Sequence, residues 1–178
     1  MHEERKVSSK EMFRGRVFRV SEDVVLLEND QEAIREVVHH NGGVCVAALD
    51  EEDNLYFVRQ YRYALGEEVL ELPAGKREKG EEPAVCGLRE LEEECGCKAG
   101  KFELLSVMYP TVGYCSEVIH IYLAQELTAV PQHLDEGEFL SVEKIPFAKA
   151  LDMVLRDEIP DGKTQLAILK IHAMRTAK

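Results

Sequence analysis

A glutamate-rich stretch from Gly75 to Cys97 constrains the fold of this chain more than any other feature. Its sequence is GKREKGEEPAVCGLRELEEECGC. Pro83 suits the first turn of a helix, where its missing N–H is not needed. Gly96 stands where a left-handed residue would end that helix. The stretch therefore predicts a loop followed by a short helix between these two residues.

The predicted helix carries two kinds of side chain. Apolar residues recur at spacings of four, three and four, which predicts one stripe facing the core: Ala84, Leu88, Leu91 and Cys95. Beside that stripe, Glu90 and Glu94 share a helix face and Glu93 lies on the same edge. Carboxylates this close repel one another unless they bind a hard divalent cation such as Mg²⁺. Arg89 can neutralise one of them. A solvated acidic face is the alternative interpretation, but it does not explain why the acids gather on one side.

These residues resemble the Nudix box, a pattern of glycine, glutamate and arginine at fixed offsets. The matching positions are Gly75, Glu81, Arg89-Glu90-Leu91, Glu93-Glu94 and Gly96, with Cys97 in place of the usual aliphatic residue. The resemblance implies an α/β/α sandwich. It also implies hydrolysis of a nucleoside diphosphate linked to another group, with Mg²⁺ as the cofactor and Mn²⁺ as an alternative.

Composition excludes several other classes of protein. With 178 residues, the chain is expected to form one domain with a small appendage. A formal net charge of −12 argues against nucleic acid or an anionic membrane as the main partner. The odd number of cysteines, 5, and the absence of a CxxC pair favour reduced thiols in the cytoplasm. The polar N-terminus predicts no signal peptide, and no apolar run has membrane-spanning length.

The N-terminal part of the chain predicts a small antiparallel β-subdomain. Residues 1–10 are expected to fray. Short strands are then expected between Phe13 and His40, separated by turns at residues 21–23 and 28–31. Three short strands are a marginal unit and need a packing partner. The turn at residues 41–43 predicts a boundary, with residues 1–41 as the subdomain and 42–178 as the hydrolase domain.

The remaining elements alternate irregularly between strands and helices. Residues 44–49 and 55–61 predict a hairpin across an acidic turn. Further strands are expected at residues 69–72, 102–108, 118–123 and 139–142, and amphipathic helices at 146–156 and 163–176. Mixed rather than alternating βα units predict an α/β fold with a mixed sheet and helices on both of its faces.

Other segments narrow the substrate class by resemblance. ELPAGK at residues 71–76, LDEGE at 134–138 and REVV from Arg35 look like ADP-ribose pyrophosphatases. This implies that water attacks the diphosphate of ADP-ribose to give AMP and ribose 5-phosphate. It also implies a homodimer, swapped through the N-terminal strands. That family commonly has Ser-Pro-Gly where this chain has Thr111-Val112-Gly113, so other nucleoside-diphosphate sugars remain open.

The resemblance also implies roles for individual residues. Glu90, Glu94, Glu138 and the carbonyl of Ala74 would bind the metal. Glu136, on a loop, is the first choice for the general base, and Glu93 is the alternative.

Other residues would support the metal ligands or bind the substrate. Gly75 and Glu81 would support the ligands. Arg89 would belong to the catalytic set, where it neutralises one acid and holds its rotamer. Arg62 would contact the diphosphate, and Arg35 with Glu36 would reach the adenine or ribose. For these last three residues a plain surface charge is the alternative.

Rival interpretations can be weighed from the sequence. Gly162-Lys163-Thr164 looks like the end of a P-loop, but Asp157 stands where the earlier glycine is needed. Among other functions that the resemblance allows, a housecleaning nucleotide phosphatase usually lacks the N-terminal strands found here. A non-catalytic sensor that binds ADP-ribose is a further rival, and the complete box argues against it. The preferred sugar, the metal and the identity of the base stay open.

Overall fold

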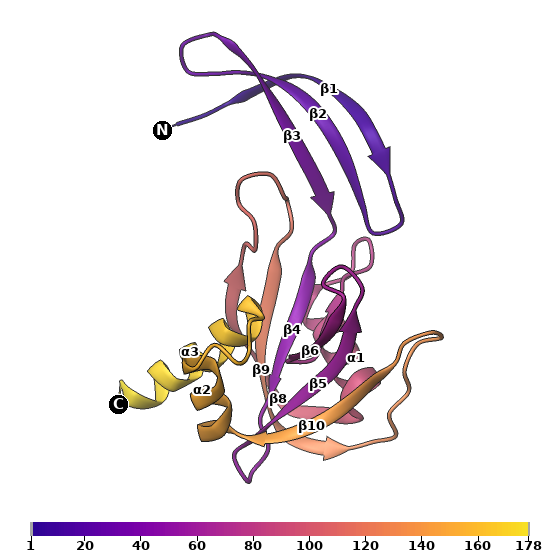
Figure 1. Cartoon of the computed structure of the whole chain (residues 1–178), viewed down its shortest axis with the longest axis vertical. Helices are drawn as coiled ribbons and strands as arrows, with labels where there is room; N and C mark the ends of the chain where they lie inside the picture. The colour runs from indigo at the N-terminus through magenta and orange to yellow at the C-terminus, as the bar shows by residue number, and fades with distance from the viewer. Residues whose placement is uncertain (1, 178) are drawn as a thin grey trace. The chain divides into compact units, whose positions relative to one another are not determined.

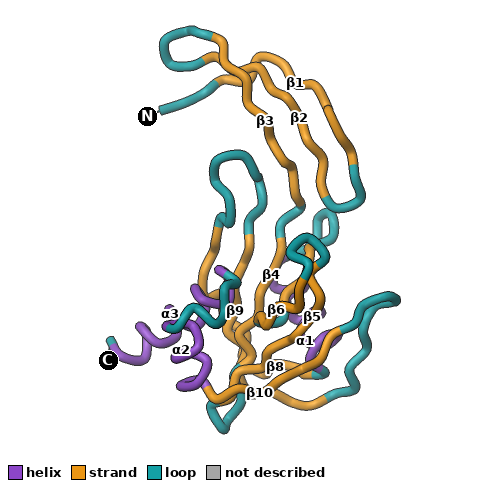
Figure 2. The backbone as a smooth tube through the Cα atoms, viewed as in Figure 1, coloured by secondary structure: helices purple, strands orange, loops and turns teal. Residues whose placement is uncertain are grey.

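The computed structural model describes residues 2–177 and divides them into two compact units (Figure 1, Figure 2). The smaller unit contains residues 2–42 together with Tyr109–Val118. The larger unit contains Gly43–Met108 together with residues 119–177.

The smaller unit is an antiparallel sheet in the order β1-β2-β3. Its strands are β1 (Arg5–Arg14), β2 (Phe18–Leu26) and β3 (Glu32–His40). The prediction that the first ten residues fray is wrong, because β1 pairs along β2 and the Ser9 hydroxyl donates to Asp23 at 2.5 Å. The predicted turn at residues 21–23 is also wrong, because this segment lies within β2 and pairs with β3.

The segment Tyr109–Val118 continues this sheet along the edge of β3. The Val38 N–H donates to the Tyr114 carbonyl at 2.8 Å, and the Ser116 N–H donates to the Val38 carbonyl at 2.9 Å. The Ser116 hydroxyl also accepts from the His40 N–H at 3.1 Å. These bonds give the backbone polar groups of β3 partners at an edge that would otherwise be open.

The larger unit is built around a four-stranded mixed sheet in the order β7-β4-β9-β8. Its strands are β4 (Gly43–Ala48), β7 (Ala74–Lys76), β8 (Cys97–Met108) and β9 (Ile119–Ala129). β4 pairs in parallel with β9 and antiparallel with β7. Every residue of β4 is buried, as its uninterrupted run of small and apolar side chains predicts.

A second sheet in this unit has the order β10-β5-β6 and is antiparallel. Its strands are β5 (Asn54–Arg62), β6 (Glu67–Glu71) and β10 (Leu140–Pro146). The predicted hairpin of β4 with β5 is wrong, since only a single bridge from Leu49 to Leu55 joins them. β4 takes β7 and β9 as its neighbours instead, and β5 therefore pairs with β6 and β10.

Helices cover both faces of the mixed sheet, as predicted (Figure 1). α1 (Pro83–Cys95) packs Leu91 against Val46 on one face. α2 (Phe147–Leu155) and α3 (Gly162–Thr176) share the main core on the other face, where Ile168 of α3 packs with Ala47. The predicted α/β/α sandwich with a mixed sheet is confirmed. Within residues 2–177, no helix has the length and apolar character needed to cross a membrane.

Candidate active site

The helix α1 buries two of its glutamates, Glu90 and Glu94. Pro83 begins it and Gly96 ends it in the left-handed region, with φ 59°, as predicted. The predicted apolar stripe is wrong, because Ala84 and Leu88 are exposed. The buried positions of α1 are Cys86, Gly87, Glu90, Leu91 and Glu94. Two carboxylates therefore occupy places that a stability argument alone would give to apolar side chains.

Glu94 is the most deeply buried of these acids, with 1% of its surface exposed. Its Oε2 accepts from the Ala74 backbone N–H at 2.9 Å. Its Oε1 is buried and has no hydrogen-bond partner among residues 2–177. Burial raises the pKa of the Glu94 carboxyl to about 8, only partly opposed by the Ala74 N–H, and Glu90 and Glu138 raise it further.

Glu90 lies against Gly75, in a space that only glycine leaves open. A Cβ added at Gly75 would stand 1.9 Å from the Glu90 carboxyl carbon. Burial raises the pKa of Glu90, while Arg89 acts in the opposite direction. The glycine of the box thus allows a buried carboxylate to reach the backbone segment that contains Ala74.

Arg89 links three of the acids on and before α1. Its guanidinium lies 2.8 Å from Glu90 Oε1 and 2.7 Å from Glu93 Oε2. Its Nε donates to Glu81 Oε1 at 3.1 Å, and this bond lowers the pKa of Glu81. Glu81 also accepts from the Glu78 N–H at 2.9 Å, which fixes the loop before the helix. Arg89 therefore holds the rotamers of the glutamates that surround it.

The loop between β9 and β10 carries the two remaining acidic residues of the predicted site. Glu138 is half-buried, and its negative charge helps to raise the pKa of both Glu90 and Glu94. Glu136 is exposed beside Gly137, which has φ 85°. Within the described chain, no three acidic, histidine or cysteine side chains already converge as a metal site.

A divalent cation nevertheless fits this region of the molecule. Glu94 Oε1 is a buried oxygen that no group in residues 2–177 partners, and a bound cation would give it one. The Glu90 carboxylate is held against Gly75, beside the Ala74 backbone. Carboxylate and carbonyl oxygens are the ligands that Mg²⁺ and Mn²⁺ prefer. Glu90 and Glu94 would hold such an ion, with Ala74 and the loop residue Glu138 supplying further oxygens.

The predicted substrate-binding residues lie in both units. Arg62 ends β5, and its Nε donates to the buried Glu71 at 2.6 Å. Arg35 and Glu36 lie in β3 of the smaller unit, where Arg35 pairs with Glu4 at 2.5 Å.

A pocket of about 580 Å³ opens beside Arg62 in the larger unit. Its walls include Leu65, Val69 and Pro160, with Lys163 at the start of α3. This combination of aliphatic walls and a few charged groups is typical of a ligand site. Sequence reasoning missed the contribution of Lys163 because it only tested, and rejected, a P-loop.

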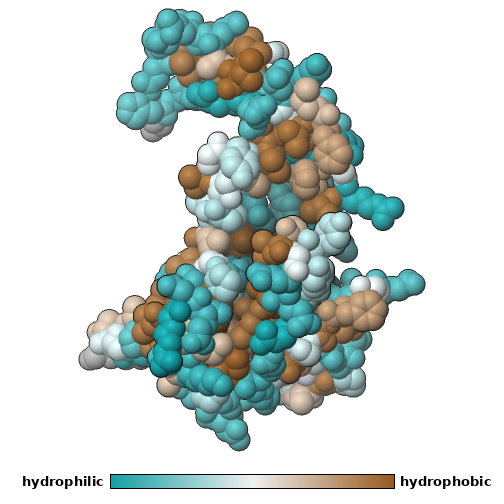
Figure 3. Space-filling model, viewed as in Figure 1, coloured by the Kyte–Doolittle hydropathy of each residue, from teal (hydrophilic) through white to brown (hydrophobic). Residues whose placement is uncertain are grey.

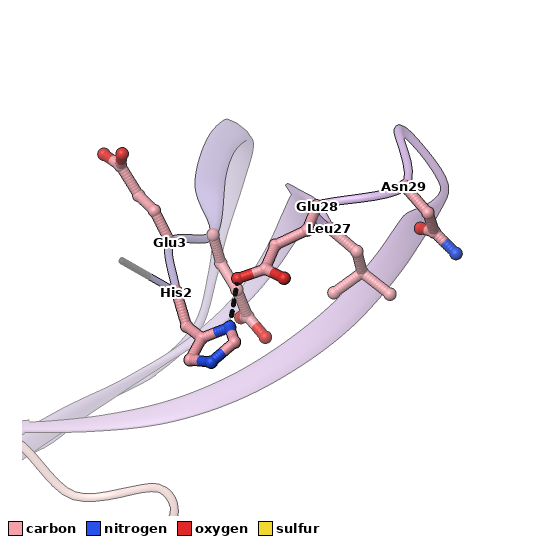
Figure 4. Close-up of a pocket in the computed structure, with 6 residues that line it drawn as sticks. His2, Glu3, Leu27, Glu28 and Asn29 are labelled. Atoms are coloured by element: carbon pink, nitrogen blue, oxygen red, sulfur yellow. Dashed lines mark hydrogen bonds and ion pairs between the residues drawn. The ribbon is translucent and has the colours of Figure 1, made fainter.

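Another pocket, of about 600 Å³, lies in the smaller unit and does not suit a phosphorylated ligand (Figure 4). Its lining is rich in carboxylates: His2, Glu3, Glu4, Leu27, Glu28 and Asn29. The His2 imidazole already pairs with Glu28 at 2.6 Å. A diphosphate would meet mostly negative charge there, so we assign no substrate site to this pocket.

Comparison with known proteins gives a consistent picture. The model of the NUDIX domain matches residues 39–165. An ADP-ribose pyrophosphatase of Bacillus subtilis is 39% identical over 168 residues, covering 93% of this chain and 91% of that protein.

Two further matches extend over almost the whole chain. A methanol dehydrogenase activator of Bacillus methanolicus is 37% identical over 180 residues, covering 100% of this chain and 97% of that protein. A crystal structure described as an ADP compounds hydrolase superposes with a TM-score of 0.85 at 21% identity, covering 98% of this chain and 95% of that one. At that identity, the superposition supports the fold alone.

Proposed function

Because this chain belongs to the NUDIX family, we propose that it hydrolyses the diphosphate of ADP-ribose to AMP and ribose 5-phosphate. The observation that carries the proposal is the buried acidic face of α1, where Glu94 Oε1 has no partner in residues 2–177. The Bacillus subtilis relative named ADP-ribose pyrophosphatase supports the choice of substrate.

A divalent cation, Mg²⁺ in our proposal and Mn²⁺ as the alternative, would lower the pKa of water and neutralise the diphosphate oxygens. Glu90 and Glu94 of α1 would hold it, together with the Ala74 carbonyl and Glu138. Arg89 keeps Glu90 and Glu93 in place through its ion pairs.

The reaction itself would be one displacement at phosphorus. A water molecule attacks, the bridging P–O bond breaks, and one proton is lost from the water. Glu136 would accept that proton, because its exposed carboxylate on a loop can reach a substrate that the fixed residues hold. Glu93 is the less suitable base, since its carboxylate is already paired with Arg89 at 2.7 Å.

Substrate binding would use arginines at two places. Arg62 would contact the diphosphate from the edge of the pocket beside it. Arg35 and Glu36 would contact the adenine or the ribose, in the chain's own site or in that of a second subunit.

The smaller unit supports the proposal of a homodimer. Phe13, Phe18 and Ile34 share one face of the β1-β2-β3 sheet and are 53%, 43% and 60% exposed. Hydrophobic side chains reach the surface of this sheet in the space-filling view (Figure 3). A second copy of the chain would bury this face. Sedimentation of the wild type should give the mass of two chains, and Ile34→Lys should give one.

The cytoplasm is the compartment we propose for the reaction. All five cysteines are free, as expected where thiols stay reduced.

The function is tested by incubating the purified protein with ADP-ribose and a panel of nucleoside-diphosphate sugars, with and without Mg²⁺. AMP formed from ADP-ribose, absent without metal and lost in Glu94→Gln, is the expected result. Cleavage of a different sugar nucleotide alone would overturn the choice of substrate and retain the chemistry. ADP-ribose binding without any hydrolysis would favour the sensor instead.

A second candidate function is activation of an alcohol dehydrogenase, favoured by the full-length likeness to the methanol dehydrogenase activator. Adding the protein to a purified methanol dehydrogenase would test it. Faster methanol oxidation with the wild type, but not with Glu94→Gln, would mean that activation requires hydrolysis. No change in rate would exclude this candidate for the dehydrogenase that was used.

A further inference from the structure

The motif Gly162-Lys163-Thr164 begins α3 and has no role in the chemistry proposed so far. Lys163 is a nearly buried lysine, with 13% of its side chain exposed. Its ammonium lies 2.6 Å from Glu71 Oε2 and 2.9 Å from Asp161 Oδ1. Burial alone lowers the pKa of a lysine, but Asp161 and Glu71 outweigh it and the pKa of Lys163 is raised. The lysine is therefore a fixed positive charge.

Glu71 divides its two oxygens between two cations. Its Oε1 accepts from the Nε of Arg62 at 2.6 Å, and its Oε2 accepts from Lys163. Glu71 is only 2% exposed, so both bonds are shielded from water. No Nη hydrogen bond of Arg62 is formed to any residue from 2 to 177. This side chain is 39% exposed and lines the pocket at the end of β5.

The position of Lys163 is itself fixed by the start of α3. Asp161 caps the helix by accepting from the Thr164 N–H at 3.1 Å. The Thr164 hydroxyl accepts from the Leu72 N–H at 2.9 Å, next to Glu71 in the chain. Two hydrogen bonds thus join the start of α3 to the end of β6: one from Lys163 to Glu71, and one from the Leu72 N–H to Thr164.

We propose that Lys163 is a positioning residue that, through Glu71, presents the Nη groups of Arg62 to the diphosphate of the substrate. The argument is one of geometry. Arg62 uses its Nε for one oxygen of Glu71, and Lys163 bonds the other oxygen. Because Lys163 holds that second oxygen, Glu71 offers no further acceptor to an Nη of Arg62, and the outer edge of the guanidinium stays available to a ligand. This inference rests on the proposed role of Arg62 in binding substrate.

The same strand offers a natural control. Arg59, three residues before Arg62, donates its Nε to Glu143 at the same 2.6 Å. That pair is open to water, with 37% and 39% of the two side chains exposed, and no lysine among the described residues shares the carboxylate. Glu143→Gln therefore removes an equivalent ion pair from β5 without touching the pocket.

The test is a double-mutant cycle on substrate hydrolysis, using Lys163→Met, Arg62→Ala and both together. We expect each single variant to raise KM about tenfold, with a smaller change in kcat, as for loss of one charge-assisted hydrogen bond. The double variant should be no worse than Arg62→Ala alone. Lys163→Arg should restore most of the lost affinity, and Glu143→Gln should keep the wild-type KM.

The outcomes separate this inference from the proposed function. Additive effects of Lys163→Met and Arg62→Ala would overturn it, because Lys163 would then act without Arg62. An unchanged KM in Arg62→Ala would overturn it too, although the wild type would still hydrolyse its substrate. If the wild type cleaves another sugar nucleotide, the cycle is measured on that compound, since the diphosphate is common to all of them.

Loss of fold is controlled by thermal melting of each variant. Removing Lys163 leaves the buried Glu71 with one cation, which is destabilising. If Lys163→Met does not fold, Glu71→Gln takes its place in the cycle, because its neutral amide holds Arg62 more weakly. Glu71→Gln should raise KM when Arg62 is present and leave KM unchanged when it is combined with Arg62→Ala.

Discussion

Two carboxyl groups are buried in different units of this molecule, and their surroundings shift their pKa values in opposite directions. Asp23 of the β1-β2-β3 sheet is 6% exposed and accepts from Ser9 at 2.5 Å and Lys6 at 3.3 Å. The Ser9 hydrogen bond is the main reason that its pKa is lowered, against the effect of burial. Asp23 is covered by neighbouring side chains of a single sheet and is fully partnered.

Glu94 in α1 has fewer hydrogen-bond partners than Asp23. It has one backbone donor, one buried oxygen without a partner in the described part of the chain, and a pKa raised to about 8. The ionised form of such a group destabilises the fold, because burial penalises an uncompensated charge. The difference separates an acid whose two oxygens both have partners from one that, in our proposal, binds a cation.

The largest effect should come from Glu94→Gln. The amide keeps the size of the side chain and an acceptor for the Ala74 N–H, but it loses the negative charge that a cation needs. We expect kcat to fall by roughly 10³-fold, because metal assistance contributes several kcal/mol to catalysis. Release of AMP from ADP-ribose measures the loss.

The same substitution, Glu94→Gln, should not lower the stability of the metal-free protein and is expected to raise it. Without metal, Glu94→Gln should melt at or above the temperature of the wild type at pH 8, since no buried charge remains. A large decrease in melting temperature in EDTA would contradict the view that Glu94 is retained at a cost to the fold.

The pH dependence of metal-free stability should differ between wild type and Glu94→Gln. The folded pKa of Glu94, about 8, lies above its value in an unfolded chain, about 4.5. Its protonated form is therefore favoured by folding, and this contribution is complete below pH about 4.5. It is lost as pH rises through 8. The wild type should lose on the order of a few kcal/mol relative to the variant across this range.

Urea denaturation in EDTA at a series of pH values measures this difference. Saturating Mg²⁺ should reduce it, because a cation partner favours the ionised carboxylate. Parallel stability profiles for the two proteins would show that folding leaves the pKa of Glu94 unchanged, and would contradict the contrast drawn with Asp23.

The glycine beneath Glu90 provides a smaller but more local test. In Gly75→Ala, the new Cβ would overlap the Glu90 carboxyl group at 1.9 Å, so that side chain must move. We expect weaker activation by Mg²⁺ and a rate lower by roughly 10- to 100-fold, as for other changes beside metal ligands. Titration of the rate with Mg²⁺ separates the two effects.

Gly100 is the matched control for this substitution. An added Cβ there also meets a glutamate, at 2.8 Å from Glu126 Oε2. Gly100 is exposed, and the carboxylate end of that side chain can swing into solvent. Gly100→Ala should therefore keep the wild-type response to Mg²⁺. Equal losses in the two variants would mean that Gly75 serves the fold rather than the position of Glu90.

The contrast between these acids also explains where sequence reasoning succeeded. Pro83 and Gly96 fix the ends of α1 through local backbone chemistry, and both ends were predicted. The apolar stripe was not, because periodicity assumes that the buried face is the apolar one. Here Glu90 and Glu94 occupy it. A helix face that buries two carboxylates breaks this rule, and breaks of this kind are expected at functional sites.

Tertiary pairing accounts for the other errors. The segment RKVSSKEMFR has little apolar alternation, so β1 was not foreseen below Phe13. Its order depends on partners such as Asp23, which is distant in the sequence. The hairpin of β4 with β5 failed because a wholly buried strand takes two neighbours inside its own sheet. The roles proposed for the loop residues Glu136 and Glu138 remain predictions.

The smallest effect should come from Asp23. In Asp23→Asn the side chain keeps its shape but loses the charge that Lys6 and the Ser9 hydroxyl stabilise. Because folding lowers the pKa of Asp23, its contribution is present at neutral pH and is lost as pH falls through the folded pKa. The variant should melt slightly below the wild type at pH 7, and the two should converge below pH about 3.8, the ordinary value for aspartate. For Glu94→Gln the difference is expected at the alkaline end and with the opposite sign. Hydrolysis per folded molecule should not change in Asp23→Asn, and a loss of kcat there would mean that the sheet carries a catalytic group.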